Sequence, residues 1–101
     1  MNDKHKKYSV KISPAANDKM YLHFEFLSRI SKDAAERLLE ILVADIKSLE
    51  RFPLRNPLYE PWPLKAGKYR YMLSAKRYRI VYQVLDNQIF VDDIQDCRRN
   101  D

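Results

Sequence analysis

The sequence predicts an α+β fold in which two antiparallel helices pack on one face of a twisted, mostly antiparallel sheet of four strands. Three observations lead to this fold: one alternating segment near the N-terminus, two segments with helical spacing, and three strand-like segments near the C-terminus. The turns between the last three segments are short, so their strands must run antiparallel. The predicted order is β-α-α-β-β-β, in a single domain over residues 1–101 whose first seven residues form a mobile arm.

The first strand and the first helix adjoin at a capping sequence. Apolar and polar residues alternate over 8–12, which is typical of a strand with one buried face. Ser13 supplies a capping hydroxyl, and Pro14 suits the first position of a helix. We therefore expect the first helix over residues 14–30.

The second helix is expected to begin at Asp33, which forms a capping-box pattern with Glu36. Apolar residues then recur at helical spacing as far as Leu49. The helix should end at Phe52, because the residue before a proline, here Pro53, disfavours the helical conformation.

The connection 53–68 contains four of the five prolines and the only glycine, Gly67. It shows neither helical nor strand periodicity and is predicted to be a stiff, extended surface segment. Apolar contacts of Leu58, Tyr59 or Trp62 would pin this segment to the domain.

Three strands are predicted in the last third of the chain, over 69–73, 78–85 and 88–94. The turns between them fall at 74–77 and 86–87, and the first strand is expected to pair with the interior of this meander.

Composition excludes several classes of function. Phosphate-cradling loops need several glycines, so kinases, NTPases and Rossmann enzymes are excluded. The single cysteine, Cys97, excludes an internal disulfide, and no residues show metal-ligand spacing, so neither metal nor cofactor is expected. The sequence contains neither a signal peptide nor an apolar run of about 18 residues, which predicts a cytoplasmic protein that does not enter the membrane.

The net charge of +5 is concentrated in the window 61–85, which has no acidic residue and several interleaved tyrosines. A basic, aromatic surface suits RNA or single-stranded nucleic acid. A solvated sheet face is the alternative interpretation. The basic residues of the window are Lys65, Lys68, Arg70, Lys76, Arg77 and Arg79.

Arg79 is the strongest candidate for a functional residue. Even positions of the strand 78–84 are apolar or aromatic and should face the helices, so Arg79 should point to the uncovered face. There it is either free to bind a phosphate or paired with Asp92 or Asp93. The pair Arg98-Arg99 beyond the last strand could complete a phosphate clamp, because arginine forks bind phosphate bidentately.

These segments together resemble the RelE/ParE superfamily of toxins from type II toxin–antitoxin modules, over about residues 8–99. The motifs that carry the resemblance are Ile12-Ser13-Pro14-Ala15-Ala16, Ile46-Lys47-Ser48-Leu49-Glu50-Arg51-Phe52-Pro53, Lys68-Tyr69-Arg70-Tyr71, Tyr78-Arg79-Ile80-Val81-Tyr82-Gln83-Val84 and Arg98-Arg99. The resemblance implies a plasmid-stabilisation or addiction toxin, which arrests growth once an unstable antitoxin is lost.

The resemblance also implies an activity. RelE-like members cut mRNA in the ribosomal A site without a metal, and basic residues balance the charge that develops on the phosphate. In that chemistry Arg79 matches the phosphate-contacting arginine of the central strand, Arg70 a second basic position, and Arg98 or Arg99 the arginine after the last strand. Met72 occupies a position where a lysine is usual, and Tyr71 or Tyr78 would have to replace the C-terminal tyrosine or histidine.

The leading expectation is a toxin that acts as a metal-independent endoribonuclease on ribosome-bound mRNA. In that case Arg79, Arg70, Arg99 and Tyr71 are the catalytic candidates, and Lys65, Lys68, Lys76, Arg77 and Arg98 bind the nucleic acid. The alternatives are a ParE-like poison of DNA gyrase and a non-catalytic relative that binds only its antitoxin. All three functions imply a cognate antitoxin, whose C-terminal segment would fold on this protein.

Overall fold

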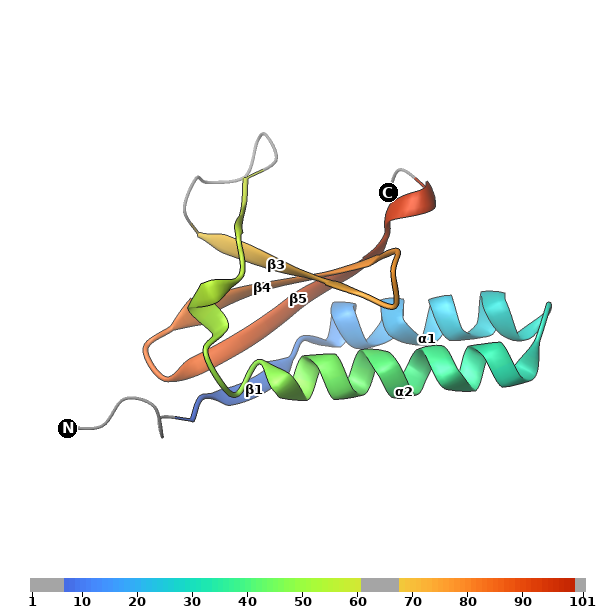
Figure 1. Cartoon of the computed structure of the whole chain (residues 1–101), viewed down its shortest axis with the longest axis horizontal. Helices are drawn as coiled ribbons and strands as arrows, with labels where there is room; N and C mark the ends of the chain where they lie inside the picture. Colours follow the sequence, from blue (N-terminus) through green and yellow to red (C-terminus); the bar gives the residue numbers. More distant parts are fainter. Residues whose placement is uncertain (1–6, 61–67, 100–101) are drawn as a thin grey trace.

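The computed structural model describes residues 7–60 and 68–99, with the side chain of Arg99 excepted. Its elements follow the chain in the order β1, α1, α2, β2, β3, β4 and β5 (Figure 1), with one 3-10 turn before β2 and another after β5. Their bounds are β1 Ser9–Ile12, α1 Pro14–Ser28, α2 Lys32–Ser48, the first turn Pro53–Arg55, β2 Leu58–Tyr59, β3 Tyr69–Ser74, β4 Tyr78–Leu85, β5 Gln88–Asp96 and the second turn Cys97–Arg99.

The predicted α+β class is confirmed, but the sheet has five strands instead of four, in the order β1-β5-β4-β3-β2. The fifth strand is β2, which lies in the connection that was expected to contain no strand and pairs antiparallel with β3. The predicted partner of the first strand is also wrong: β1 runs parallel to β5, the last strand of the meander. The reason is that β3 and β5 already occupy both edges of β4.

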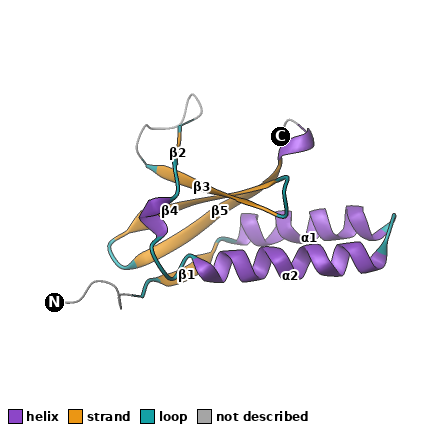
Figure 2. Ribbon diagram, viewed as in Figure 1, coloured by secondary structure: helices purple, strands orange, loops and turns teal. Residues whose placement is uncertain are grey.

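Both helices lie on one face of the sheet (Figure 2), and each begins at a serine cap. The Ser13 hydroxyl accepts a hydrogen bond from the Ala16 amide, as its position before Pro14 predicts. The expected cap at Asp33 is wrong, because the Ser31 hydroxyl accepts from the Ala34 amide and α2 begins before Asp33 is reached.

The helices end earlier than predicted. Helix α1 ends at Ser28, two residues before position 30, and α2 ends at Ser48 instead of continuing to Phe52. After α2 the amides of Glu50 and Arg51 each bond to the carbonyl three residues earlier, which tightens the chain out of the α-helix. Phe52 then adopts a left-handed conformation and turns the chain toward the sheet.

The core fills the space between the helices and the inner face of the sheet. Its fully buried members come from both helices and from strands β4 and β5, among them Leu42, Ile80, Tyr82, Ile89 and Ile94. Tyr82 is the largest of these side chains. The even positions of β4 therefore face the helices, as the alternation predicts.

The hydroxyl of Tyr82 extends past the core to the turn after α2. It donates a hydrogen bond of 2.5 Å to the carbonyl of Pro53 and accepts one of 2.9 Å from the side-chain amide of Asn56. Burial raises the pKa of this phenol, so it remains a neutral donor through the physiological range. A core side chain thus fixes a segment that shows no regular periodicity in the sequence.

Replacing Tyr82 with phenylalanine removes this hydroxyl while preserving the ring. The change leaves the buried Pro53 carbonyl without its donor, so we expect the free energy of unfolding to fall by about 1–3 kcal/mol. Urea denaturation measures this change as a lower midpoint with an unchanged slope. The half-exposed Tyr21 serves as the control, since Tyr21→Phe should leave the midpoint unchanged.

Candidate functional site

The candidate site is the face of the sheet that the helices leave uncovered. In the register, Arg79 on β4 lies between Leu73 on β3 and Gln95 on β5. Its neighbours in sequence, Tyr78 and Ile80, belong to the core on the opposite face. The predicted orientation of Arg79, away from the helices, is confirmed.

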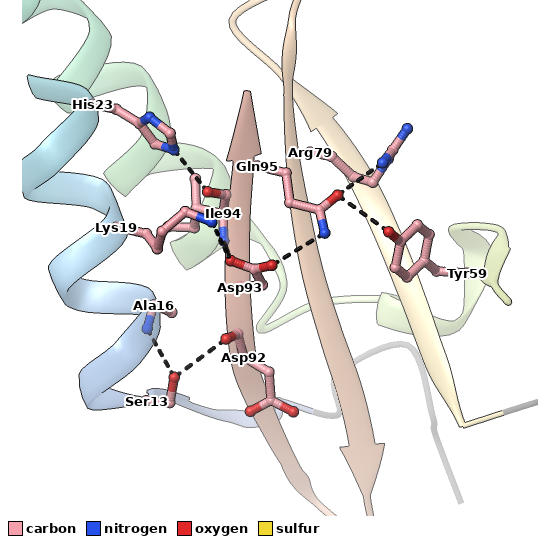
Figure 3. Close-up of polar contacts among 10 residues, drawn as sticks. All are labelled: Ser13, Ala16, Lys19, His23, Tyr59, Arg79, Asp92, Asp93, Ile94 and Gln95. Carbon is pink, nitrogen blue, oxygen red and sulfur yellow. Dashed lines mark hydrogen bonds and ion pairs between the residues drawn. The ribbon is translucent and has the colours of Figure 1, made fainter. Parts of the chain in front are cut away.

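Arg79 does not stand free on this face. Its Nη1 donates a hydrogen bond of 2.8 Å to Oε1 of Gln95 (Figure 3), and its guanidinium lies 5.1 Å from the ring centre of Tyr59 and 5.5 Å from that of Tyr71. The two tyrosine rings meet edge to face, with their centres 5.9 Å apart. Cation–π contacts therefore hold the guanidinium beside two rings, and its Nε is buried with no hydrogen-bond partner in the described chain.

The alternative expectation, an ion pair of Arg79 with Asp92 or Asp93, is wrong: among the described residues Arg79 forms no ion pair. Asp93 instead binds Lys19 of α1, with 3.0 Å between Nζ and Oδ1, and accepts a hydrogen bond of 3.1 Å from Nε2 of Gln95. The Gln95 amide oxygen, which faces the other way, also accepts from the Tyr59 hydroxyl at 3.2 Å. Gln95 thus connects the Lys19–Asp93 pair to the Arg79 guanidinium.

Helix α1 anchors the strand that carries this network. Nε2 of His23 lies 2.7 Å from the carbonyl oxygen of Ile94, and the His23 ring is buried against Tyr78 at a centroid distance of 5.1 Å. Ser13 also reaches the carbonyl of Asp92, at 3.5 Å. Because β1 pairs with β5 only as far as Val91, these side chains satisfy part of the edge that β1 leaves open.

Tyr71 is the one predicted site residue that the described chain places beside Arg79, and the predicted basic residues do not gather there. Arg70 pairs with Tyr82 across the sheet, so it faces the helix side, where its Nη1 donates to the carbonyl of Asn56 at 2.6 Å. Arg77 also contacts residues of the helix side, through the Tyr78 hydroxyl at 3.0 Å and Asp96 at 3.8 Å.

The remaining cations are exposed or lie beyond the described chain. Lys68 stands 5.5 Å from the ring centre of Tyr69, and Lys76 and Arg98 are exposed at the β3–β4 turn and in the last 3-10 turn. Lys65 and the side chain of Arg99 lie outside the described residues, as does Trp62. In the described part of the window 61–85, the basic side chains therefore do not form one continuous surface.

A second polar cluster on the open face surrounds Asp92. This residue is the extra one at a bulge, because Val81 pairs with Asp93 and Tyr82 with Val91. Its carboxylate accepts a hydrogen bond of 2.7 Å from Gln83. Partial burial, together with the charge and hydrogen bonding of Asp92, raises the pKa of the Tyr69 phenol. Two carboxylates thus share the face with Arg79, which weakens its attraction for a polyanion.

Three members of this site, Lys19, Tyr59 and Gln95, have no local sequence signal that predicts their role. The sequence indicates Tyr59 only as an anchor of the connection 53–68, because nothing local shows that it lies over Arg79. Within the described ranges 7–60 and 68–98, no three His, Cys, Asp or Glu side chains could hold a metal ion. No described helix is long and apolar enough to cross a membrane.

Comparison with known proteins identifies the fold and the family. The profile of the family described as the ParE toxin of the type II toxin–antitoxin system parDE matches residues 10–101. A chain of the chromosomal ParDE system from P. aeruginosa is similar, with a TM-score of 0.73, 14% identity, and coverage of 90% of this chain and 97% of that one. A chain of the toxin–antitoxin complex RelBE2 from Mycobacterium tuberculosis is similar with a TM-score of 0.63, 21% identity and coverage of 94% and 97%. No curated protein matches significantly.

The Asp92 cluster predicts a pH dependence. The pKa of Tyr69 lies above the ordinary 10.0, so its neutral form contributes stability that is present below pH 10.0 and is lost as the pH rises through the folded-state pKa. Asp92→Asn removes the neighbouring charge and should lower the pKa of Tyr69, although burial keeps it raised. An NMR titration of ring-labelled tyrosine measures the shift. Asp33→Asn, on exposed α2 surface, should leave it unchanged.

Proposed function

This chain belongs to the ParE toxin family of type II toxin–antitoxin systems, and from that membership we propose that it arrests growth by poisoning DNA gyrase. This reverses the order of the two activities expected from the sequence. The observation that carries the proposal is the separation of the basic side chains. Cleavage of RNA needs several cations around one phosphate, whereas Arg70 and Arg79 lie on opposite faces of the sheet.

The contacts of Arg79 support the same proposal. Its guanidinium is already bound to Gln95 and two tyrosine rings, and the carboxylates of Asp92 and Asp93 share its face. A scissile phosphate would have to displace these contacts and approach the carboxylate of Asp92 and the Lys19–Asp93 ion pair. A toxin that acts by binding a protein does not require such a converging cationic site.

We further propose that a cognate antitoxin stores the protein in an inactive complex. Both similar structures are named as toxin–antitoxin systems or complexes. On this chain the hairpin of β3 and β4 presents Leu73 with 60% of its surface exposed, close to Arg79 in the register. An antitoxin segment that folds over this hairpin would bury an apolar side chain and block the open face.

Expression without the antitoxin tests the proposed target directly. We expect loss of negative supercoiling activity and gyrase-linked DNA breaks before protein synthesis declines, because the gyrase complex is the first to be affected. Plasmid topology and pulse-labelled translation, followed in one culture, measure both. Early translational arrest with cuts at codon boundaries in mRNA would contradict the proposal, and normal growth would indicate a relative that binds only its antitoxin.

The second candidate function is cleavage of ribosome-bound mRNA, and one observation favours it. Arg79 lies mid-sheet on the uncovered face with Tyr71 beside it, which is the pairing of a phosphate ligand and a phenol that such chemistry would use. Under this function Arg79 contacts the scissile phosphate and Tyr71 transfers a proton.

Arg79→Lys separates the two functions. A lysine keeps the charge but cannot form a bidentate fork on phosphate, so RNA cleavage would lose most of its toxicity while the melting temperature stays close to that of the parent. Under gyrase poisoning we expect the variant to remain toxic. Growth after induction and thermal denaturation are measured together, and Lys11→Arg, exposed on β1, provides the reverse exchange as a control.

A further inference from the structure

The short turn after α2 displays an exposed group of side chains that the sheet face does not explain. We call residues 51–55 the cationic turn. Arg51, Phe52, Leu54 and Arg55 are exposed, and Phe52 and Leu54 each keep 54% of their surface accessible. Only Pro53, between them, is buried. Two large apolar side chains and two guanidinium groups thus project from five consecutive residues.

Side chains of the sheet hold the backbone of the cationic turn in place. The Tyr82 hydroxyl, at the end of a fully buried side chain, binds both the Pro53 carbonyl and Asn56. Arg70 binds the carbonyl of Asn56, and the Arg55 amide bonds back to the Phe52 carbonyl at 3.3 Å. The exposed side chains are therefore presented on a fixed backbone, which lowers the conformational entropy that this segment loses when it binds a partner.

Phe52 occupies a strained backbone conformation. Its φ of 52° and ψ of 46° lie in the left-handed region, which is unfavourable for a residue other than glycine. Glycine is the usual residue where a chain turns out of a helix in this way, and Phe52 is not one of the side chains that form the core or pack against it. Core packing therefore does not explain an aromatic ring at this position.

The charges of the cationic turn are not neutralised by neighbours. Glu50 is the nearest acidic residue in sequence, and its carboxylate binds Lys7 and Lys47, at 3.7 Å each. Neither Arg51 nor Arg55 forms an ion pair with any residue that the structure describes. Arg70 adds a third positive charge beside the turn through Asn56. The surface is suited to a partner that supplies carboxylates.

We propose that the cationic turn is the surface with which the toxin binds an acidic site on gyrase, an inference that rests on the proposed function. The exposed ring of Phe52 and the side chain of Leu54 would enter an apolar depression, and Arg51 and Arg55 would bind carboxylates around it. This division into an apolar centre and a charged rim is that of a protein interface. Phe52 and Leu54 have no role in binding a DNA backbone, which favours the protein over its DNA.

Phe52→Gly is the sharpest test, because it should separate binding from stability. Glycine tolerates the left-handed conformation, so the melting temperature should rise while the affinity of the toxin for purified gyrase falls roughly tenfold or more. Ala75→Gly is the matched control: Ala75 has a φ of 51° in the β3–β4 turn. It should raise the melting temperature and leave gyrase affinity unchanged.

The charged rim is tested by the double variant Arg51→Glu and Arg55→Glu. It should slow association with gyrase and remove the acceleration that low salt gives the parent. The double variant Arg29→Glu and Arg37→Glu changes the net charge equally at two exposed positions, one just after α1 and one on α2, and should retain most of that acceleration. Circular dichroism and thermal denaturation report that each variant is folded, and antitoxin binding is measured for every variant as a separate readout.

The outcomes are distinct. If the parent binds gyrase and both glycine variants bind it equally well, the cationic turn is only structural and the inference is overturned while the proposed function stands. If the turn variants lose the antitoxin but keep gyrase, the surface belongs to the antitoxin and the inference is again overturned. If the parent does not bind gyrase, both proposals fall.

Discussion

The buried phenol of Tyr82 is the contact on which the arrangement of the open face depends. Its ring lies in the core, while its hydroxyl fixes Pro53 and Asn56. The next residue, Pro57, accepts a hydrogen bond of 3.1 Å from the Tyr71 amide, which sets β2 against β3. Only because β2 is placed there does Tyr59 reach across the sheet to Arg79 and Gln95. A hydrogen bond on the helix side thus determines what surrounds the arginine on the other side.

Strand β5 carries the second connection between the two faces. Its Asp93 binds Lys19 of α1, and its Gln95 binds Arg79 and Tyr59 on the open face. Gln95 and Asp93 each have more than one partner, so the Arg79 guanidinium is held by a network and not by a single opposite charge. Such a group is well placed for packing the face but must exchange its partners before it can bind an anion.

The sequence predicted what depends on local pattern. Strand β4 has the predicted bounds 78–85, and the Ser13 cap before Pro14 forms as expected. The sequence did not predict features that depend on contacts between residues distant along the chain. Tyr59 and Gln95 are 36 residues apart, and Lys19 and Asp93 are 74 apart. The face on which Arg70 lies follows from its register with Tyr82, which no pattern within β3 reveals. The basic residues are therefore close together in the sequence but lie on different faces of the sheet in the structure.

The geometry of the cationic turn is set by the core and not by the turn's own preference. A left-handed phenylalanine costs about 1–2 kcal/mol, which is close to what one hydrogen bond from a buried hydroxyl contributes. The cost of the left-handed conformation and the contribution of the hydrogen bond nearly cancel, so the turn would not be stable in this conformation without the Tyr82 contact. Because the Tyr82 hydroxyl supplies the favourable term, a change in the packing around its buried ring alters the conformation of Phe52 even when no exposed residue is substituted. The conformation of the exposed turn is thus coupled to the packing of the buried sheet.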